Sequence, residues 1–214
     1  MPTPPPTEAE LFDVRERARI VQAARALYLR EGIDGVSVTD LARYLRMPEH
    51  AVRRWFPTPE PLVEAVVEAH VAAVRAELSS YRERFSTAVE ELLALRNWVS
   101  EELRASRGPF FQQLAAGYPE ARQRWHAHLT SFPMEHLRAN LRQGLQQGLY
   151  RPDLAVEQEV TNWFAQLDTL RQSHGTGSDA AETHHALLTK FLARLVTPAG
   201  ALVARRLQEA APYY

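Results

Sequence analysis

The stretch RIVQAARALYLREGIDGVSVTDLARYLRMPEHAVRRWFPTPEPL at 19–62 decides the fold of this chain. Its apolar residues recur at the three- and four-residue spacing of helices that bury one face. The pattern predicts a first helix that ends at Gly32, because glycine readily adopts a left-handed C-cap. A second helix should begin after Ser37, since Ser37 and Asp40 have the S-x-x-D spacing of a capping box. A third helix should run from residue 49 to residue 56.

Three short helices around one small apolar cluster form a helix-turn-helix, whose last helix enters the major groove of DNA. On the third predicted helix, Val52 and Phe56 lie four residues apart and should face inward. The opposite side is left to meet a partner, and it carries Glu49, His50, Arg53 and Arg54.

The segments AARALYLREG, SVTDLA and RRWF resemble the tetracycline-repressor (TetR) family of bacterial transcription regulators. A later segment, LRANLRQGLQQGLYRPDLAVEQEV at 137–160, is similar to the helix-glycine-helix junction before the dimerisation helices of that family. The resemblance implies a homodimer that binds a double-stranded, palindromic DNA operator through its third helix. It also implies a repressor that a small-molecule effector, not identified by the sequence, releases from DNA.

Four positions depart from the family pattern. Arg46 stands where members commonly have the glycine of the turn, and Pro48 where they have a serine cap. Arg53 replaces a tyrosine that contacts the DNA backbone, and Pro59 replaces a lysine that opens the fourth helix. The fold does not depend on these residues, but the usual phosphate contacts do. The rival interpretation is therefore a TetR-like helical protein that binds a ligand or a protein partner and has lost specific DNA binding.

Seven residues are assigned to DNA binding by the predicted helices and by the resemblance. They are Ser37 as a helix cap, Thr39 on phosphate, Glu49, His50 and Arg53 on bases, and Arg54 and Trp55 against the DNA backbone. The alternative for Arg53 and Arg54 is that they are surface arginines, which favour the C-terminal end of any helix. Glu49 would likewise favour a helix N-terminus without touching DNA.

The overall charge gives no general attraction to nucleic acid. Of 214 residues, 25 are Lys or Arg and 26 are Asp or Glu, so the formal net charge is −1. Between residues 15 and 56, however, nine arginines face five acidic residues, a surplus of +4. An ordinary solvated helical surface could carry this surplus, but on a helix-turn-helix it favours DNA binding.

The cellular context follows from what the sequence lacks. No cysteine is present, which excludes disulfides, thiol catalysis and cysteine-based zinc sites and is compatible with a cytoplasmic location. Residues 1–10, MPTPPPTEAE, have neither the basic start nor the apolar run of a signal peptide, and they are expected to be a disordered arm. No run of eighteen apolar residues occurs, so we expect a cytoplasmic protein without membrane contact.

The expected fold class is all-α, because proline and glycine divide the chain into helical stretches and strand-like alternation is absent. After the arm we expect a helix-turn-helix DNA-binding domain at 11–57 and a larger helical ligand-binding and dimerisation domain at 58–214. A long fourth helix should start at Pro59. Pro133 should kink or break a later helix that spans 119–148.

Two sets of apolar residues in the larger domain receive roles from the resemblance. The effector pocket is expected among aromatic residues of the middle helices, although each one taken alone is more simply a core residue; they are Trp98, Phe110, Phe111, Tyr118, Trp125, Phe132 and Trp163. The last long helices should form a two-fold dimer interface through Trp163, Phe164, Leu167, Leu188, Phe191 and Leu195. A shift of the fourth helix on effector binding would then change the separation of the two recognition helices.

The sequence contains few residues in the patterns that catalytic sites or metal sites require. Glu182 and His185 form an E-x-x-H pair like half of a di-iron site, but such a site needs a second pair and two further glutamates. No second E-x-x-H occurs in the chain. Nucleophile elbows and glycine-rich phosphate loops are also absent. We therefore expect no enzyme activity, no metal site and no cofactor.

Overall fold

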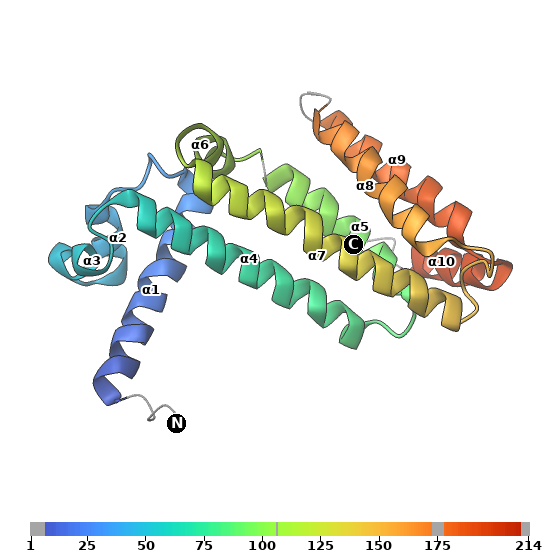
Figure 1. The fold of residues 1–214 in the computed structure, drawn as a ribbon, viewed down its shortest axis with the longest axis horizontal. Helices are drawn as coiled ribbons and strands as arrows, with labels where there is room; N and C mark the ends of the chain where they lie inside the picture. Colours follow the sequence, from blue (N-terminus) through green and yellow to red (C-terminus); the bar gives the residue numbers. More distant parts are fainter. Residues whose placement is uncertain (1–6, 106, 173–177, 211–214) are drawn as a thin grey trace. The chain divides into compact units, whose positions relative to one another are not determined.

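The computed structural model describes residues 7–105, 107–172 and 178–210 (Figure 1). Its named elements are ten α-helices, which confirms the all-α prediction. They are α1 (Glu8–Glu31), α2 (Val38–Leu45), α3 (Glu49–Trp55), α4 (Pro59–Arg84), α5 (Ala88–Ala105), α6 (Pro109–Gly117), α7 (Pro119–Gln146), α8 (Val156–Gln172), α9 (Ser178–Leu195) and α10 (Pro198–Ala210). Among these described residues, no helix is long and apolar enough to cross a membrane.

The first helix begins earlier than the sequence pattern predicts. Thr7 and Glu10 form a capping box, in which the Thr7 amide donates to the Glu10 carboxylate at 2.7 Å and the Glu10 amide donates to the Thr7 hydroxyl at 3.3 Å. These two bonds satisfy amide groups that a helix start otherwise leaves unpaired. The prediction of a disordered arm over 1–10 was therefore wrong for residues 8–10, and residues 1–6 lie outside the described ranges.

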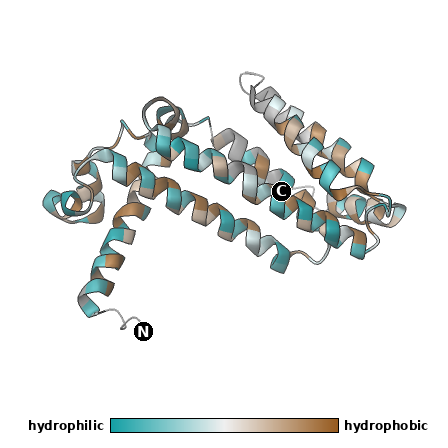
Figure 2. Cartoon of the chain, in the orientation of Figure 1, coloured by the Kyte–Doolittle hydropathy of each residue, from teal (hydrophilic) through white to brown (hydrophobic). Residues whose placement is uncertain are grey.

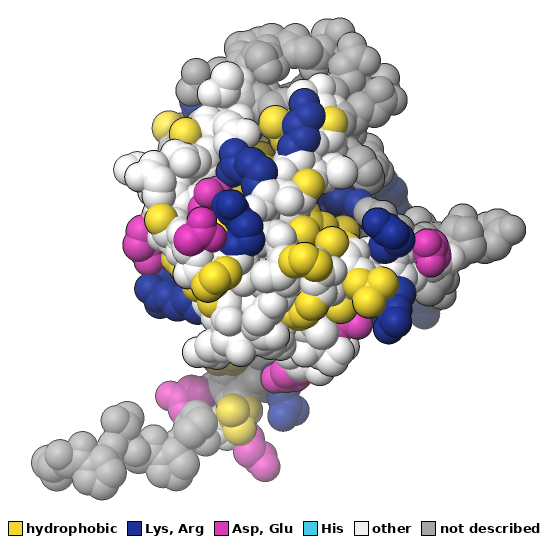
Figure 3. Space-filling view, turned by 90° about the vertical axis from the view of Figure 1, so that its right-hand side faces the viewer, with side chains coloured by type: hydrophobic (Ala, Val, Ile, Leu, Met, Phe, Trp, Pro, Cys, Tyr) yellow, Lys and Arg dark blue, Asp and Glu magenta, His cyan; other side chains and the backbone are white. Residues whose placement is uncertain are grey.

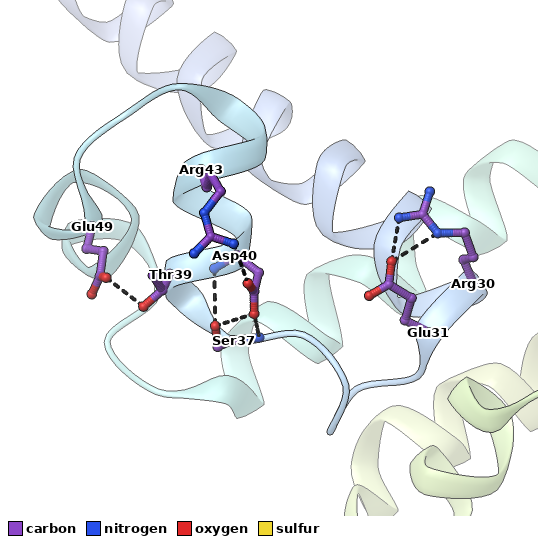
Figure 4. A network of polar contacts seen from close by, with 7 residues as sticks. All are labelled: Arg30, Glu31, Ser37, Thr39, Asp40, Arg43 and Glu49. Carbon is purple, nitrogen blue, oxygen red and sulfur yellow. Dashed lines mark hydrogen bonds and ion pairs between the residues drawn. The ribbon is translucent and has the colours of Figure 1, made fainter.

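The capping box of the second helix and the end of the first helix are confirmed. The Ser37 hydroxyl accepts from the Asp40 amide at 3.1 Å, and the Asp40 carboxylate accepts from the Ser37 amide at 3.1 Å (Figure 4). Gly32 ends α1 as predicted, but its φ of +84° and ψ of 169° do not form the expected left-handed C-cap; this conformation is open almost only to glycine. A Cβ atom there would lie 2.6 Å from Oε1 of Gln113. Arg46, at the turn, has φ 54° and ψ 45°, so a non-glycine residue adopts the left-handed conformation.

The chain divides into two compact units. The N-terminal unit comprises Met1–Ala73 and Ala105–His126, and the C-terminal unit comprises Val74–Arg104 and Ala127–Tyr214. The expected DNA-binding domain at 11–57 is contained in the N-terminal unit, which adds α6 and the starts of α4 and α7. The physical reason is core packing: Tyr28 of α1 stacks on Phe110 of α6 with 6.3 Å between the ring centroids, so α6 completes the apolar cluster.

Helix α7 runs through Pro133 without a break, so of the predicted kink or break the break was wrong. Leu137 and Leu141, on the following two turns, are buried in the core of the C-terminal unit. Packing of this kind outweighs the hydrogen bond that a proline removes from a helix.

In the C-terminal unit, the segment that follows α7 packs back against the end of that helix. A Cβ atom at Gly144 would lie 2.0 Å from Cδ2 of Tyr150, so the ring occupies the space that the missing side chain leaves. Helices α8 and α9 then run side by side (Figure 1). Where these two helices carry a hydropathy colour, both hydrophobic and hydrophilic residues are present (Figure 2), as expected of helices with one buried face.

Candidate nucleic-acid interface

Helix α3 buries one side and exposes the other. Val52 is fully buried, and Phe56, directly after the helix, is 2% exposed, as the four-residue spacing predicts. The exposed side presents His50, Arg53 and Arg54 to solvent. Pro48 at the N-cap makes no side-chain capping bond, so this short helix lacks the usual anchor at its first turn.

The start of α3 is held by contacts with α2 instead. The Thr39 hydroxyl donates to Oε1 of Glu49 at 2.6 Å (Figure 4). Glu49 also lies 3.7 Å from Nη2 of Arg53, one turn further along the same helix. Three of the predicted DNA-contacting residues are thus linked to one another before any partner binds.

The end of α3 is held by two acidic residues of α1. Nη2 of Arg54 donates to both carboxylate oxygens of Asp13, at 3.0 and 3.2 Å, and Nε1 of Trp55 donates to Oε2 of Glu16 at 3.1 Å. The Arg54 guanidinium also lies over the Trp55 ring, with 5.2 Å between Cζ and the ring centroid. Sequence reasoning missed Asp13 and Glu16, because no short-range pattern links them to residues about forty positions away.

Two arginines of α1 that contribute to the local positive charge are also engaged within the N-terminal unit. Nη2 of Arg19 donates to the Leu45 carbonyl at 2.6 Å, at the C-terminal end of α2. Arg17 lies over the Phe56 ring, 5.3 Å from its centroid. Part of the surplus of positive charge therefore holds the three helices together, and the exposed cations of α3 remain the main candidates for DNA contact.

The seven aromatic residues predicted to line an effector pocket are divided between the two compact units. Phe110, Phe111, Tyr118 and Trp125 belong to the N-terminal unit, whereas Trp98, Phe132 and Trp163 belong to the C-terminal unit. In the N-terminal unit, Phe111 packs against Trp125 with 5.2 Å between ring centroids, and both contact the buried His70 ring. In the C-terminal unit, Trp98 and Phe132 share a small core cluster, while Trp163 packs against Phe191 at 4.8 Å.

One of the seven, Tyr118, lines a pocket of about 280 Å³ in the N-terminal unit. Its walls also include Tyr28, Leu41, Phe56 and Arg53, so it reaches the exposed side of α3. Burial, together with the nearby Tyr118, raises the pKa of Tyr28 to about 12.

The six residues predicted for the dimer interface all lie in the core of the protomer. Each is at most 7% exposed, and together they belong to the main apolar cluster of the C-terminal unit: Trp163, Phe164, Leu167, Leu188, Phe191 and Leu195. They hold α8 and α9 against the rest of their own unit. A partner that docks on these helices would have to contact their outer faces.

The structure does not test the E-x-x-H pair as a metal site. Glu182 and His185 lie in α9, but their side chains fall outside the described part of the chain. Among the side chains that the structure does describe, no group of three His, Cys, Asp or Glu residues is placed to hold a metal ion.

Comparison with known proteins identifies the fold. No protein-family model matches the chain, and no curated protein does. Solved structures do match: a TetR-family transcriptional regulator from Cytophaga hutchinsonii has a TM-score of 0.65 and 16% identity over 91% of this chain and 99% of its own. A TetR-family regulator from Mesorhizobium loti has a TM-score of 0.62 and 17% identity, with 90% and 100% of the two chains covered.

A third match is a transcriptional regulator from Saccharomonospora viridis solved in complex with choline, with a TM-score of 0.53 and 19% identity over 86% of this chain and 99% of that chain. All three similarities run through both units and lie at low sequence identity. This chain has the fold of the TetR-family transcriptional regulators.

Proposed function

We propose that this protein is a DNA-binding transcription regulator that acts as a homodimer, with α3 as its recognition helix. The observation that carries the proposal is the two-sided character of α3: Val52 is buried against the other helices, while His50 and Arg53 point to solvent. A helix that exposes basic and hydrogen-bonding side chains at the end of a helix-turn-helix can place them against base edges in the major groove. The fold shared with TetR-family regulators supports the same function.

The test is selection of bound fragments from random double-stranded DNA, followed by affinity measurements at two salt concentrations. The Arg53→Ala/Arg54→Ala variant should lose specific binding while its helicity stays unchanged. The matched control is Arg205→Ala/Arg206→Ala, which removes the same charge from exposed positions of α10. Equal binding by the parent and the Arg53/Arg54 variant would show that α3 does not read DNA.

We propose that the dimer forms through the outer faces of α8 and α9. On α8 the exposed residues Thr161, Ala165 and Thr169 lie four apart on one stripe. Both threonine hydroxyls donate to carbonyls of their own helix, Thr161 at 2.8 Å and Thr169 at 2.9 Å, so the stripe presents small, uncharged groups to a partner. Hydrophobic side chains with basic side chains around them also gather on the face that Figure 3 shows. Leu202 of α10 is 49% exposed.

We propose further that the protein is a repressor and that a small molecule releases it from DNA. One structural neighbour was solved in complex with choline, which supports a small-molecule effector for this chain. Coupling between effector and operator is reciprocal, typically about 1 to 3 kcal/mol, so a saturating operator must weaken effector binding by the same factor. The test titrates a ligand found by thermal-shift screening, with and without operator.

Two tryptophan variants locate the effector site. Trp125→Ala probes the aromatic cluster of the N-terminal unit, and Trp163→Ala probes the core of the C-terminal unit. The variant that weakens the ligand identifies the unit that binds it. Equal ligand affinity with and without operator would contradict release by a small molecule.

A second candidate function is a protein of the same fold that binds a ligand or a protein partner without recognising DNA. The observation in its favour is that Glu49, Arg54 and Trp55 are all engaged in contacts within the N-terminal unit. The uncapped start of α3 at Pro48 points the same way. If selection from random DNA enriches no sequence at low or at moderate salt, this second function replaces the first.

A further inference from the structure

The contact between Asp13 and Arg54 resembles the contact that an arginine makes with DNA. Nη2 of Arg54 faces two carboxylate oxygens of Asp13 at 3.0 and 3.2 Å, and a backbone phosphate would offer the same donor two anionic oxygens. We propose, on the basis of the proposed DNA-binding function, that Asp13 competes with DNA phosphate for Arg54. The first helix would thereby set the affinity of the recognition helix for DNA.

The pair is weak enough for DNA to displace it. The Arg54 and Asp13 side chains are 62% and 39% exposed, so water screens the attraction between them. Exposed ion pairs of this kind change an equilibrium constant by about two- to fivefold. A phosphate backbone carries a dense row of negative charges, and binding to it releases condensed counterions, which a single carboxylate cannot do.

The Trp55 ring keeps the Arg54 guanidinium near the end of α3, whether Arg54 pairs with Asp13 or with phosphate. The guanidinium lies 5.2 Å from the Trp55 ring centroid, and Glu16 fixes that ring by accepting from Nε1 at 3.1 Å. An arginine released from Asp13 is therefore still held beside the recognition helix. Glu16 itself binds a neutral indole N–H, so loss of its charge frees no cation.

This difference supplies a matched control. Asp13→Asn and Glu16→Gln each remove one negative charge from α1, three residues apart, and Gln keeps an oxygen that can accept from Trp55. The affinity of both variants and of the parent is measured by fluorescence anisotropy on the DNA selected from a random pool. Asp13→Asn should bind about two- to fivefold more tightly for each recognition helix that engages DNA. Its salt dependence should keep nearly the same slope, because DNA displaces Asp13 in the parent and Arg54 meets the same phosphate in both proteins.

Glu16→Gln should gain less than Asp13→Asn. Equal gains in the two variants would mean that any acid on α1 repels DNA, and the specific role of Asp13 would be lost. The double variant Asp13→Asn/Arg54→Ala must bind like Arg54→Ala alone, since the released cation is gone. Asp13→Ala should reproduce the gain without any hydrogen bond from residue 13.

Unchanged or weaker binding by both Asp13 variants, with thermal unfolding as in the parent, overturns the inference and leaves the proposed function intact. In that case Asp13 positions α3 and does not compete with DNA phosphate for Arg54. Failure of the parent and of every variant to bind DNA overturns the proposed function as well. DNA binding by the parent protein therefore distinguishes failure of the Asp13 inference from failure of the proposed function.

Discussion

Glu91 of α5 and His136 of α7 lie 2.7 Å apart, Oε1 to Nε2, although their side chains are only 2% and 5% exposed. Asn140 donates to the second oxygen of Glu91 at 2.7 Å, and Nε of Arg82 lies 3.8 Å from Oε1. The Tyr150 hydroxyl lies 3.0 Å from Oδ1 of Asn140 and extends the network. These contacts tie α5, α7 and the segment after α7 into one polar core within the C-terminal unit.

Removal of the Glu91 carboxylate should destabilise the C-terminal unit. Glu91→Ala leaves the polar groups of His136 and Asn140 buried without their acidic partner, and a buried polar group left unpaired costs about 1 to 3 kcal/mol. Urea unfolding followed by circular dichroism measures this loss. Glu90→Ala is the neighbouring control: its carboxylate caps the exposed start of α5 at Ser86, so its loss should cost only about 1 kcal/mol. Equal costs for the two variants would contradict a special role for the buried network.

Acid should weaken the protein through the same carboxylate. Burial alone raises the pKa of Glu91, but the contacts with His136 and Asn140 and the nearby Arg82 outweigh burial and hold the pKa below its usual value of 4.5. Because the folded pKa is lowered, the contribution is fully present above pH 4.5 and is lost as the pH falls through the folded pKa. The difference in unfolding free energy between the parent and Glu91→Gln should therefore shrink below that pH. A constant difference down to pH 3 would refute this linkage.

Substitution of Arg46 by glycine should stabilise the protein. Arg46 holds φ 54° and ψ 45°, a left-handed conformation that costs a side-chain-bearing residue about 1 to 2 kcal/mol. Glycine removes that cost but adds freedom to the unfolded chain, so the expected net gain is about 0.5 kcal/mol. Arg43→Gly, inside α2, is the control and should lose about 1 kcal/mol. A loss of stability in Arg46→Gly would show that the Arg46 side chain contributes more than its backbone costs.

Gly144 should not tolerate a side chain. An alanine Cβ would lie 2.0 Å from Cδ2 and 2.2 Å from Cε2 of Tyr150, a ring that is 1% exposed and cannot move aside freely. Overpacking of this kind costs about 1 to 3 kcal/mol. At Gly117, in the last turn of α6, nothing lies within 4 Å of an added Cβ, so Gly117→Ala should be neutral or stabilising. Thermal melts of the two variants give the comparison, and similar melting temperatures would contradict it.

The dimer proposal predicts different outcomes for buried and exposed substitutions. Leu167→Asp/Phe191→Asp places two charges in the core of the protomer and should unfold the C-terminal unit. Ala165→Asp/Ala193→Asp changes exposed positions of α8 and α9, and should yield folded monomers that no longer bind DNA. Sedimentation velocity and circular dichroism separate the two outcomes. A folded dimer of the Ala165/Ala193 variant would place the interface on another surface.

The sequence by itself determined the features that depend on neighbours in the chain. The capping box of Ser37 and Asp40, the end of α1 at Gly32 and the burial of Val52 all follow from groups a few residues apart. The same reasoning did not predict the start of α1, where the capping box of Thr7 and Glu10 lies among prolines and acidic residues. It also predicted that the helix could break at Pro133, which it does not, because local helix propensity does not include the packing on either side.

Only the tertiary structure decided which charged and aromatic groups meet. Arg54 reaches Asp13 across 41 residues, and Asn140 reaches Glu91 across 49. Such pairs depend on how helices dock, which periodicity does not specify, since many positions on a helix have the same hydrophobic pattern. For the same reason the sequence could identify Trp163, Leu167 and Phe191 as apolar helix positions but could not tell a dimer interface from the core of one protomer. Removal of apolar surface from water is favourable in both environments.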